Sequence, residues 1–255
     1  MKRALIGHTG FVGSNLLRAE SFHATFNSQN VEELVGQTFD LVVCAGAPGV
    51  KWKANQDPDR DSDIIQRLQR CLAGCKARQV VLISTVDVYP RPLGVDESSH
   101  IDPQECHPYG RHRFMLEGFV AGRFPTTTVR LPGLFGRGLQ KNVIYDLMHD
   151  NQVDRIHPES TFQYYDLEWL WGDVCRAKDG NLKTLNLSTE PIRTADLARQ
   201  VFGRRLESDA SGPPARYDFR SRHCGSMGGR DGYLRSASEV LSAMERFVTT
   251  EGGGA

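Results

Sequence analysis

Short apolar runs alternate with amphipathic segments over the first half of the chain. Strands are predicted at residues 3–7, 23–27, 39–45, 80–84 and 126–131, with continuous apolar runs at 41–45 and 80–83. Apolar residues at helical spacing lie between them, at 11–19, 31–34, 59–78 and 109–124. Buried strands that are separated by helices are typical of right-handed βαβ crossovers. The pattern therefore predicts an α/β fold with a doubly wound parallel sheet of the Rossmann type.

The alternation becomes less regular after residue 136. Further elements are predicted as helices at 143–149, 167–178 and 194–202 and as extended segments at 162–165, 184–187 and 215–222. Thr194 is the expected N-cap of the helix that it begins, and Ser236 with Glu239 forms a capping box for a last helix. Residues 249–255 are expected to be a loose tail. We predict a first domain over 1–136 and a small second portion over 137–255, interleaved with the last sheet strands and helices.

Composition and charge exclude several classes of protein. The 255 residues carry 31 Lys and Arg against 31 Asp and Glu, so no basic excess favours a nucleic-acid partner. We find no run of about 20 apolar residues and no signal-peptide core, so we expect a cytoplasmic protein without membrane association. The six cysteines and eight histidines lack the spacing of a metal site, and we expect reduced thiols and no bound metal.

Three glycines follow the first predicted strand and precede the first predicted helix. Gly7, Gly10 and Gly13 are spaced by three residues. Such glycines allow a tight turn, close approach of backbone amides to a pyrophosphate, and close helix packing, while the helix N-terminus attracts the anion. The loop lacks the Gly-Lys-Ser/Thr ending of a nucleoside-triphosphate loop. We expect the loop to bind a dinucleotide through the three glycines and Thr9, Phe11 and Val12.

The end of the second predicted strand indicates which dinucleotide binds. Asn27 and Ser28 stand where a carboxylate often holds the ribose 2′-hydroxyl. Residues 19–50 contain no Lys or Arg that could hold a 2′-phosphate. An asparagine can still hydrogen-bond a hydroxyl. NAD is therefore the expected cofactor, with NADP as the alternative.

At four further places the chain resembles the extended short-chain dehydrogenase/reductase family of NAD-dependent sugar-nucleotide epimerases, dehydratases and reductases. Besides the glycine loop these are Cys44-Ala45-Gly46-Ala47, residues 83–89 (Ile-Ser-Thr-Val-Asp-Val-Tyr), residues 109–113 (Tyr-Gly-Arg-His-Arg) and residues 130–136. The resemblance covers about residues 1–136. It implies that the cofactor also contacts Cys44, Ala45, Gly46, Leu131, Pro132 and Gly133.

The resemblance assigns catalysis to Thr85, Tyr109 and position 113. A tyrosine acts as a general acid/base near neutral pH when adjacent positive charge lowers its pKa, and a cation four residues later lies one helical turn away. By the family motif Thr85 supplies the second hydroxyl, with its neighbour Ser84 in reserve. The family has Lys at position 113, whereas this chain has Arg113, which keeps the charge but not the compact ammonium. Tyr109 and Arg113 are also expected to contact the cofactor.

The expected reaction is epimerisation or ketone reduction of a nucleotide-linked sugar. Related dehydratases carry an Asp-Glu pair directly after the catalytic hydroxyl, where this chain has Val86 and Asp87, and elimination needs both carboxyl groups. The expected substrate contacts are Thr85, Asp87, Lys141, Asn142 and Gln163. The resemblance also implies a homodimer through the Tyr109 helix and the helix before it. The alternative that Arg113 suggests is an NAD(P)-binding sensor or scaffold with impaired catalysis.

Overall fold

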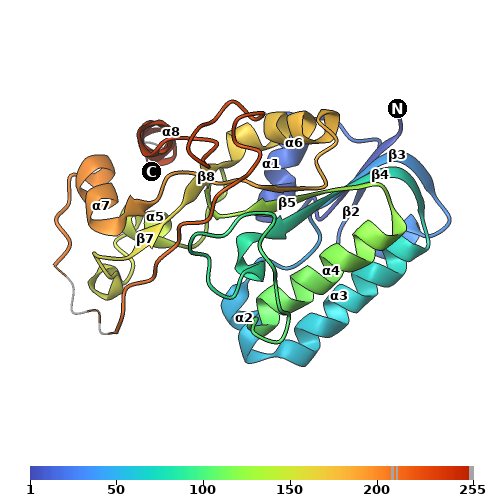
Figure 1. Ribbon diagram of the computed structural model, residues 1–255, viewed down its shortest axis with the longest axis horizontal. Coiled ribbons are helices and arrows are strands. Elements are labelled where there is room, and N and C mark those ends of the chain that lie inside the picture. The colour runs from blue at the N-terminus through green and yellow to red at the C-terminus, as the bar shows by residue number, and fades with distance from the viewer. Residues whose placement is uncertain (208–209, 211, 253–255) are drawn as a thin grey trace. The chain divides into compact units, whose positions relative to one another are not determined.

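The computed structural model describes residues 1–207, 210 and 212–252 (Figure 1). It contains a six-stranded parallel sheet, with five strands from residues 3–131 and a sixth from residues 184–186. The strand order is β2 (Ala24–Phe26), β1 (Arg3–Ile6), β3 (Thr38–Cys44), β4 (Lys76–Thr85), β5 (Thr126–Leu131) and β9 (Thr184–Asn186). All neighbouring strands in it run parallel. The strand order changes direction between β1 and β3, which is where ligands bind in open α/β sheets. The predicted doubly wound sheet is confirmed.

Helices cover both faces of this sheet (Figure 1). One face carries α1 (Phe11–Ala19) and α6 (Leu170–Asp179), and the other carries α3 (Pro58–Ala73) and α4 (Pro108–Arg123). Ile65, Leu68 and Leu72 of α3 and Leu116 and Val120 of α4 are buried in one core with the sheet strands. Burying whole apolar side chains contributes roughly 1.5–3 kcal/mol each, so these helices hold the ends of the strands firmly.

Four local elements differ from the sequence prediction. The predicted helix over 59–78 ends at Ala73, because Gly74 caps it and β4 already begins at Lys76. Residues Val31–Leu34 form a 3₁₀ helix, η1. The short helix α2 (Lys51–Gln56) and the 3₁₀ turn η2 (Val86–Val88) carry too few apolar residues to show periodicity and were not predicted. Both follow carboxyl ends of sheet strands.

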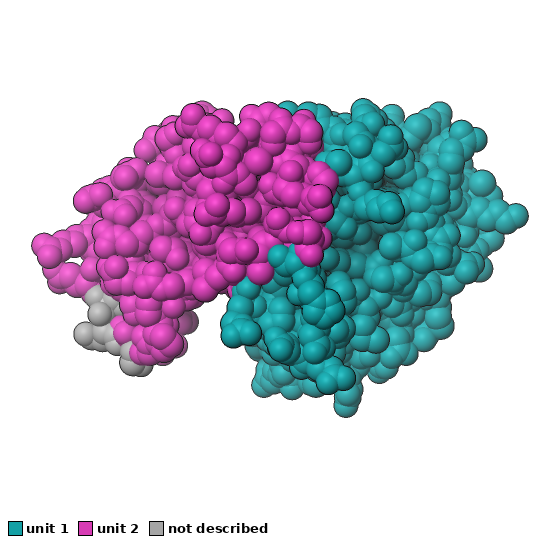
Figure 2. All heavy atoms as spheres, in the orientation of Figure 1, with its two compact units in different colours: residues 1–91, 99–131, 170–186 teal, residues 92–98, 132–169, 187–255 magenta. Residues whose placement is uncertain are grey.

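The chain divides into two compact units, which Figure 2 colours separately. Unit 1 comprises residues 1–91, 99–131 and 170–186 and contains the parallel sheet. Unit 2 comprises residues 92–98, 132–169 and 187–255.

Unit 2 combines short strands with three helices. The strand β6 (Gly133–Phe135) runs parallel to β8 (Tyr164–Asp166), and β7 (Thr161–Phe162) runs antiparallel to β10 (Ile192–Arg193). The helices are α5 (Val143–Met148), α7 (Thr194–Phe202) and α8 (Ala237–Gly252), with 3₁₀ turns η3 (Val153–Arg155) and η4 (Leu167–Trp169). They share a core of Phe135, Ile144, Leu197, Val240 and Met244.

The helix ends of unit 2 test two capping predictions. The capping box is confirmed: the Glu239 carboxylate accepts from the Ser236 N–H at 2.8 Å, and the Glu239 N–H donates to Ser236 Oγ at 3.3 Å. The N-cap predicted at Thr194 is wrong, because Arg193 is the N-cap and the Thr194 hydroxyl donates to the Ser160 carbonyl.

Two other predictions for unit 2 are also corrected. Residues 215–222 make isolated bridges at Arg216 and Asp218 rather than a strand. Residues 249–252 continue α8 instead of forming a tail, and 253–255 lie outside the described residues. Across the described part of the chain, no helix has the length and apolar character that a membrane span requires.

Candidate active site

The glycine loop joins β1 to α1 with very close backbone contacts. Gly7 has φ +88°, and a Cβ on it would lie 2.3 Å from the Ala45 carbonyl oxygen. A Cβ on Gly13 would lie 2.0 Å from the Gly7 oxygen. The space beside Gly10 is open apart from one contact at 3.4 Å, and no side chain caps the N-terminus of α1. The first turn of α1 therefore offers backbone N–H groups to an anion, and Thr9, Phe11 and Val12 lie in this turn and loop.

The end of β3 packs directly against this loop. The Ala45 N–H donates to the Ile6 carbonyl at 2.9 Å, and a Cβ on Gly46 would meet the Ile6 side chain. The Cys44 thiol is fully buried, and burial raises its pKa to about 11. Cys44 is thus a packing residue, while Ala45 and Gly46 shape the rim of the loop.

Asn27 and Ser28 follow β2 in a tight turn. The Asn27 side-chain oxygen accepts from the Gln29 N–H at 2.8 Å. The Ser28 carbonyl accepts from the guanidinium of Arg67 on α3 at 2.9 Å, and the same guanidinium makes two hydrogen bonds to Glu32. Sequence reasoning looked for a cation only near Asn27 and missed Arg67, which lies 39 residues beyond Ser28.

Two hydroxyl groups at the end of β4 have different surroundings. The Ser84 hydroxyl donates to the buried Glu117 carboxylate, which also pairs with Arg130. Thr85 is 9% exposed, accepts from the Asp87 N–H at 3.1 Å and acts to lower the pKa of the Tyr109 phenol. The geometry therefore favours Thr85 over Ser84 as the hydroxyl beside Tyr109.

Tyr109 lies in the first turn of α4, where several groups fix its position. Pro108 begins the helix, and His107 caps it by accepting from the Gly110 N–H at 3.1 Å. The Tyr109 N–H donates to the Asn55 side chain at 3.0 Å. Gly110 is required here because a Cβ on it would lie 2.1 Å from the Asp87 carbonyl oxygen. The first turn of α4 is thereby held against η2 and α2.

Arg113 lies beneath Tyr109, as the four-residue spacing predicts. Its guanidinium carbon is 4.0 Å from the centroid of the Tyr109 ring. The same guanidinium makes two hydrogen bonds to Asp61 on α3 and donates to the Pro48 carbonyl at 2.7 Å. His112 also bonds Asp61, at 2.7 Å. Arg113 is 2% exposed and Asp61 4%, so this is a buried ion pair that joins α3 to α4.

The charge on the buried pair is set by opposing effects. Burial acts to raise the pKa of Asp61, but hydrogen bonds from Arg113 and His112 outweigh it and leave that pKa below its ordinary value. Asp61 is therefore ionised at neutral pH, and it holds Arg113 on the ring face of Tyr109.

The pKa of Tyr109 departs from the expectation drawn from the sequence. Burial raises it above its ordinary value, and the positive charge of Arg113 and the Thr85 hydrogen bond offset only part of that effect. Asp87 adds to the rise and Lys51 opposes it. The expected lowering is wrong because desolvation of the phenol exceeds the attraction of the adjacent charges. A neutral phenol is a proton donor at neutral pH.

Asp87 is paired with a lysine that sequence reasoning did not single out. Lys51 at the start of α2 places its Nζ 2.8 Å from Asp87 Oδ1. The pair connects α2 to η2 beside the first turn of α4. The two residues are 36 positions apart, so no spacing in the sequence indicates that they pair.

The predicted substrate contacts in unit 2 have other partners. The Asn142 side chain caps α5 by accepting from the Ile144 and Tyr145 N–H groups and donates to the Leu134 carbonyl. The buried Gln163 amide bonds the Thr189 carbonyl and both backbone groups of Phe219. These amides hold backbone segments of unit 2 together, and substrate contacts by Asn142 and Gln163 stay predictions.

Other predicted residues of the strand-end turns keep simpler positions. Leu131 is buried at the end of β5, and Pro132 follows it. Gly133 begins β6, and its N–H donates to the Gln163 carbonyl at 3.1 Å. Lys141 is exposed. Roles for these four residues stay predictions.

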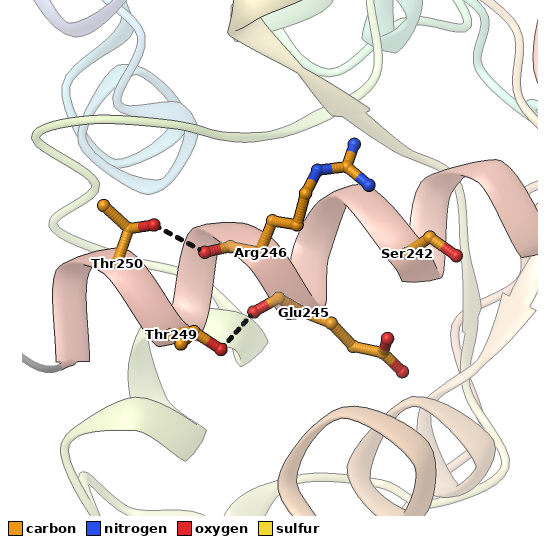
Figure 3. Close-up of a pocket in the computed structure, with 5 residues that line it drawn as sticks. All are labelled: Ser242, Glu245, Arg246, Thr249 and Thr250. Atoms are coloured by element: carbon orange, nitrogen blue, oxygen red, sulfur yellow. Dashed lines mark hydrogen bonds between the residues drawn. The ribbon is translucent and has the colours of Figure 1, made fainter.

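A pocket on α8 is lined by none of the predicted site residues. Its lining is Ser242, Glu245, Arg246, Thr249 and Thr250 (Figure 3). The two threonine hydroxyls donate to the carbonyls of Glu245 and Arg246, one turn earlier. In residues 1–207, 210 and 212–252, no group of three or more His, Cys, Asp or Glu side chains is arranged to hold a metal ion.

Comparison with sequence families settles the class of the protein. The model of the NAD dependent epimerase/dehydratase family matches residues 21–159. The chain belongs to this family. The match confirms the predicted family and the NAD dependence that the family name states. No curated protein sequence matches the chain.

Solved structures share the fold at low sequence identity. A UDP-galactose 4-epimerase is 18% identical, with a TM-score of 0.72 and coverage of 98% of this chain and 99% of that chain. A UDP-N-acetylglucosamine 4-epimerase from Methanobrevibacter ruminantium M1 is 13% identical, with a TM-score of 0.75 and 97% coverage of both chains. A dTDP-4-dehydrorhamnose reductase from Bacillus anthracis, solved with NADP, is 17% identical, with a TM-score of 0.74 and coverage of 98% and 99%.

Proposed function

We propose that the protein is an NAD-dependent epimerase or ketoreductase that acts on a nucleotide-linked sugar, with Tyr109 as the general acid/base. The observation that carries this proposal is the arrangement of the buried Tyr109 side chain: its ring centroid lies 4.0 Å from the guanidinium carbon of Arg113, and the Thr85 hydroxyl at the carboxyl end of β4 acts to lower the pKa of its phenol. The family match supports the class of reaction. The named substrates of the similar structures, UDP and dTDP sugars, support the class of substrate.

The residues around the glycine loop fit a dinucleotide. The uncapped N-terminus of α1 and the open space beside Gly10 suit a pyrophosphate, while Gly7 and Gly13 permit the close backbone contacts that shape the loop. Asn27 lies at the end of β2, where an adenosine ribose hydroxyl is expected. When bound, NAD supplies the acceptor and donor of a hydride. The residues assigned to it are those of the glycine loop, Asn27 and the turns after β3 and β5.

Tyr109 and Thr85 divide the work on the sugar oxygen. In oxidation the alcohol carbon loses a hydride with both electrons of its C–H bond, and the hydroxyl proton passes to the Tyr109 oxygen. In reduction Tyr109 returns that proton to the new alkoxide. Thr85 donates a hydrogen bond to the phenolate or to the sugar oxygen. The raised pKa of Tyr109 keeps the phenol protonated at neutral pH, which is the form that the reductive step needs.

The carboxylate beside the site argues against dehydration. Elimination requires a free acid and a free base, but Val86 is apolar and Asp87 is paired with Lys51. Epimerisation and ketone reduction need only hydride transfer and the Tyr109 proton. We therefore propose these two reactions.

A substrate panel tests the proposed function. The purified protein is incubated with NAD or NADH and with UDP-, dTDP- and GDP-linked hexoses and 4-keto hexoses. The products are separated and identified by NMR, because an epimerase shows no net change in nicotinamide absorbance. A changed sugar from at least one nucleotide sugar is expected. Binding of NAD with every sugar unchanged would contradict the proposal.

The fixed position of Arg113 favours one second candidate. Its guanidinium is bound by Asp61 and Pro48 and replaces the expected lysine, so an NAD-binding sensor without turnover is the alternative function. Binding of NAD together with absence of turnover across the panel would support that alternative.

We also propose a homodimer through α3 and α4. Apolar side chains remain exposed on both helices, with Ile64 at 39% and Met115 at 57%. Light scattering of the wild type and of Ile64→Lys/Met115→Lys tests this. A dimer that becomes a monomer in the variant is expected, and a wild-type monomer would contradict it.

A further inference from the structure

Arg113 is poorly placed to stabilise the Tyr109 oxygen when that oxygen loses or gains a proton. It lies against the ring face, and its amino groups bond Asp61 and the Pro48 carbonyl. Its planar guanidinium is fixed by this geometry, whereas an ammonium on a flexible stem can reorient its three donors. The family has a lysine ammonium beside its catalytic tyrosine. If proton transfer by Tyr109 uses such an ammonium, another lysine of this chain must supply it.

Lys51 is an ammonium in the same region of unit 1. It begins α2, its Nζ is 2.8 Å from Asp87 Oδ1, and its side chain is 39% exposed while that of Asp87 is 18% exposed. A partly exposed lysine keeps its charge and can change partners. The Lys51–Asp87 pair thus joins a movable cation to a more buried anion.

The fold places this pair at the first turn of α4. Asn55 lies four residues after Lys51 on α2, so the two side chains share one face of that helix. Asn55 accepts a hydrogen bond from the Tyr109 N–H at 3.0 Å. The face of α2 that carries Lys51 therefore docks on the residue whose phenol is assigned to catalysis.

The turn that carries Asp87 docks on the same place from another direction. Its carbonyl oxygen fills the space that a side chain at position 110 would occupy. The hydroxyl of Thr85 accepts from the Asp87 N–H at 3.1 Å and acts to lower the pKa of the Tyr109 phenol. The elements α2, η2 and α4 thus bring Lys51, Asp87 and Tyr109 together.

We propose that Lys51, held by Asp87, is the positioning cation for proton transfer by Tyr109, and that Arg113 is a structural clamp between α4 and α3. This proposal rests on the proposed function for the role of Tyr109. It assigns to the start of α2 the ammonium that the family has at position 113.

The charges around the Tyr109 phenol predict in which direction each substitution changes the pKa of Tyr109. Burial raises the pKa of Tyr109, Asp87 raises it further, and Arg113, the Thr85 hydrogen bond and Lys51 lower it. His107, whose ring is 6.1 Å from that of Tyr109, is kept neutral because burial and the Lys51 charge lower its pKa. Loss of Lys51 removes a cation and leaves the Asp87 carboxylate uncompensated, and both changes raise the pKa of Tyr109. Loss of the Asp87 charge lowers it.

A titration of Tyr109 tests this assignment without any substrate. The phenol is followed by NMR of protein labelled at the tyrosine ring carbon, and its signal is assigned by its absence in Tyr109→Phe. The variants are Lys51→Met, Lys51→Arg and Asp87→Asn. The matched control is Lys53→Met, which removes an exposed lysine from the same helix. Circular dichroism verifies that each variant is folded.

The variants are expected to change the pKa of Tyr109 in different directions. The Tyr109 pKa rises in Lys51→Met, stays near the wild-type value in Lys51→Arg and falls in Asp87→Asn. In an active enzyme the pH profile of kcat moves in the same directions. Equal Tyr109 titrations in the wild type and Lys51→Met, or an equal shift in Lys53→Met, would overturn the proposal. The titration does not require turnover of a sugar. A negative titration result can therefore be told apart from failure of the proposed function.

Discussion

The guanidinium carbon of Arg113 lies 4.0 Å from the centroid of the Tyr109 ring while its amino groups bond the Asp61 carboxylate. The same residue therefore stacks on the candidate catalytic side chain and ties α4 to α3. A buried ion pair tolerates loss of one partner poorly, because the other charge is left without compensation.

Replacement of Arg113 by lysine tests whether this position is a decayed catalytic one. Lysine keeps the charge but makes only one of the two hydrogen bonds to Asp61, so we expect the free energy of unfolding to fall by about 1–3 kcal/mol. Urea denaturation measures this change. Turnover is expected to remain at or below the wild-type value in Arg113→Lys. A gain of tenfold or more in kcat would instead show that Arg113 impairs catalysis.

The close contact of Gly13 with Gly7 predicts a severe effect of a single methyl group. In Gly13→Ala the new Cβ would lie 2.0 Å from a backbone oxygen, so we expect loss of NAD binding together with a lower melting temperature. Isothermal titration calorimetry and thermal denaturation measure the two effects. Gly118→Ala is the matched control: this glycine lies in α4 with no atom within 4 Å of an added Cβ. We expect Gly118→Ala to stabilise the protein by roughly 0.5–1 kcal/mol.

The pairing of Arg67 with Glu32 predicts a change in cofactor preference. Arg67 lies beside Ser28, where a 2′-phosphate is expected to project, but Glu32 neutralises it through two hydrogen bonds. In Glu32→Gln the guanidinium is released, and we expect NADP to bind about tenfold more tightly while the Kd for NAD changes little. Glu33→Gln makes the same change of net charge one residue away. Equal gains in NADP affinity in both variants would show that the change of net charge, and not the release of Arg67, causes the effect.

Burial of Asp166 predicts a pH dependence of stability. Burial raises the pKa of this carboxyl from 3.8 to about 6 in the folded protein. Between these values the unfolded chain has lost the proton and the folded protein retains it, so the free energy of unfolding falls as pH rises, by at most about 3 kcal/mol. In Asp166→Asn the fall is expected to disappear, since the amide still accepts from the Glu168 N–H. Denaturation at pH values from about 4 to about 7 tests this, with Asp63→Asn as an exposed control.

Features that depend on neighbours in the sequence were predictable. The glycine loop, the stacking of Arg113 on Tyr109 and the capping box at Ser236 arise within one turn or one helix, so spacing alone indicates them. The sheet could be predicted because its central strands β3 and β4 contain apolar runs and the segments between the strands have helical spacing.

Features that depend on distant residues were not predictable. Asp61 holds Arg113 from 52 residues away, Lys51 reaches Asp87 across 36, and Arg67 reaches Ser28 across 39. No spacing rule indicates such partners. The family motif indicated Thr85 rather than Ser84, but the partner of the Ser84 hydroxyl, the Glu117 carboxylate 33 residues away, could not be predicted. The pKa of Tyr109 depends on burial, which spacing does not show.

The central claim is that the Tyr109 phenol moves the proton during hydride transfer on a nucleotide sugar. The most direct test compares kcat of the wild type and Tyr109→Phe on the sugar nucleotide that the panel identifies, with the Kd for NAD measured in both. We predict that kcat falls by a factor of about 10²–10⁴ in Tyr109→Phe while the Kd for NAD stays within about threefold. A kcat in Tyr109→Phe equal to that of the wild type would contradict the claim.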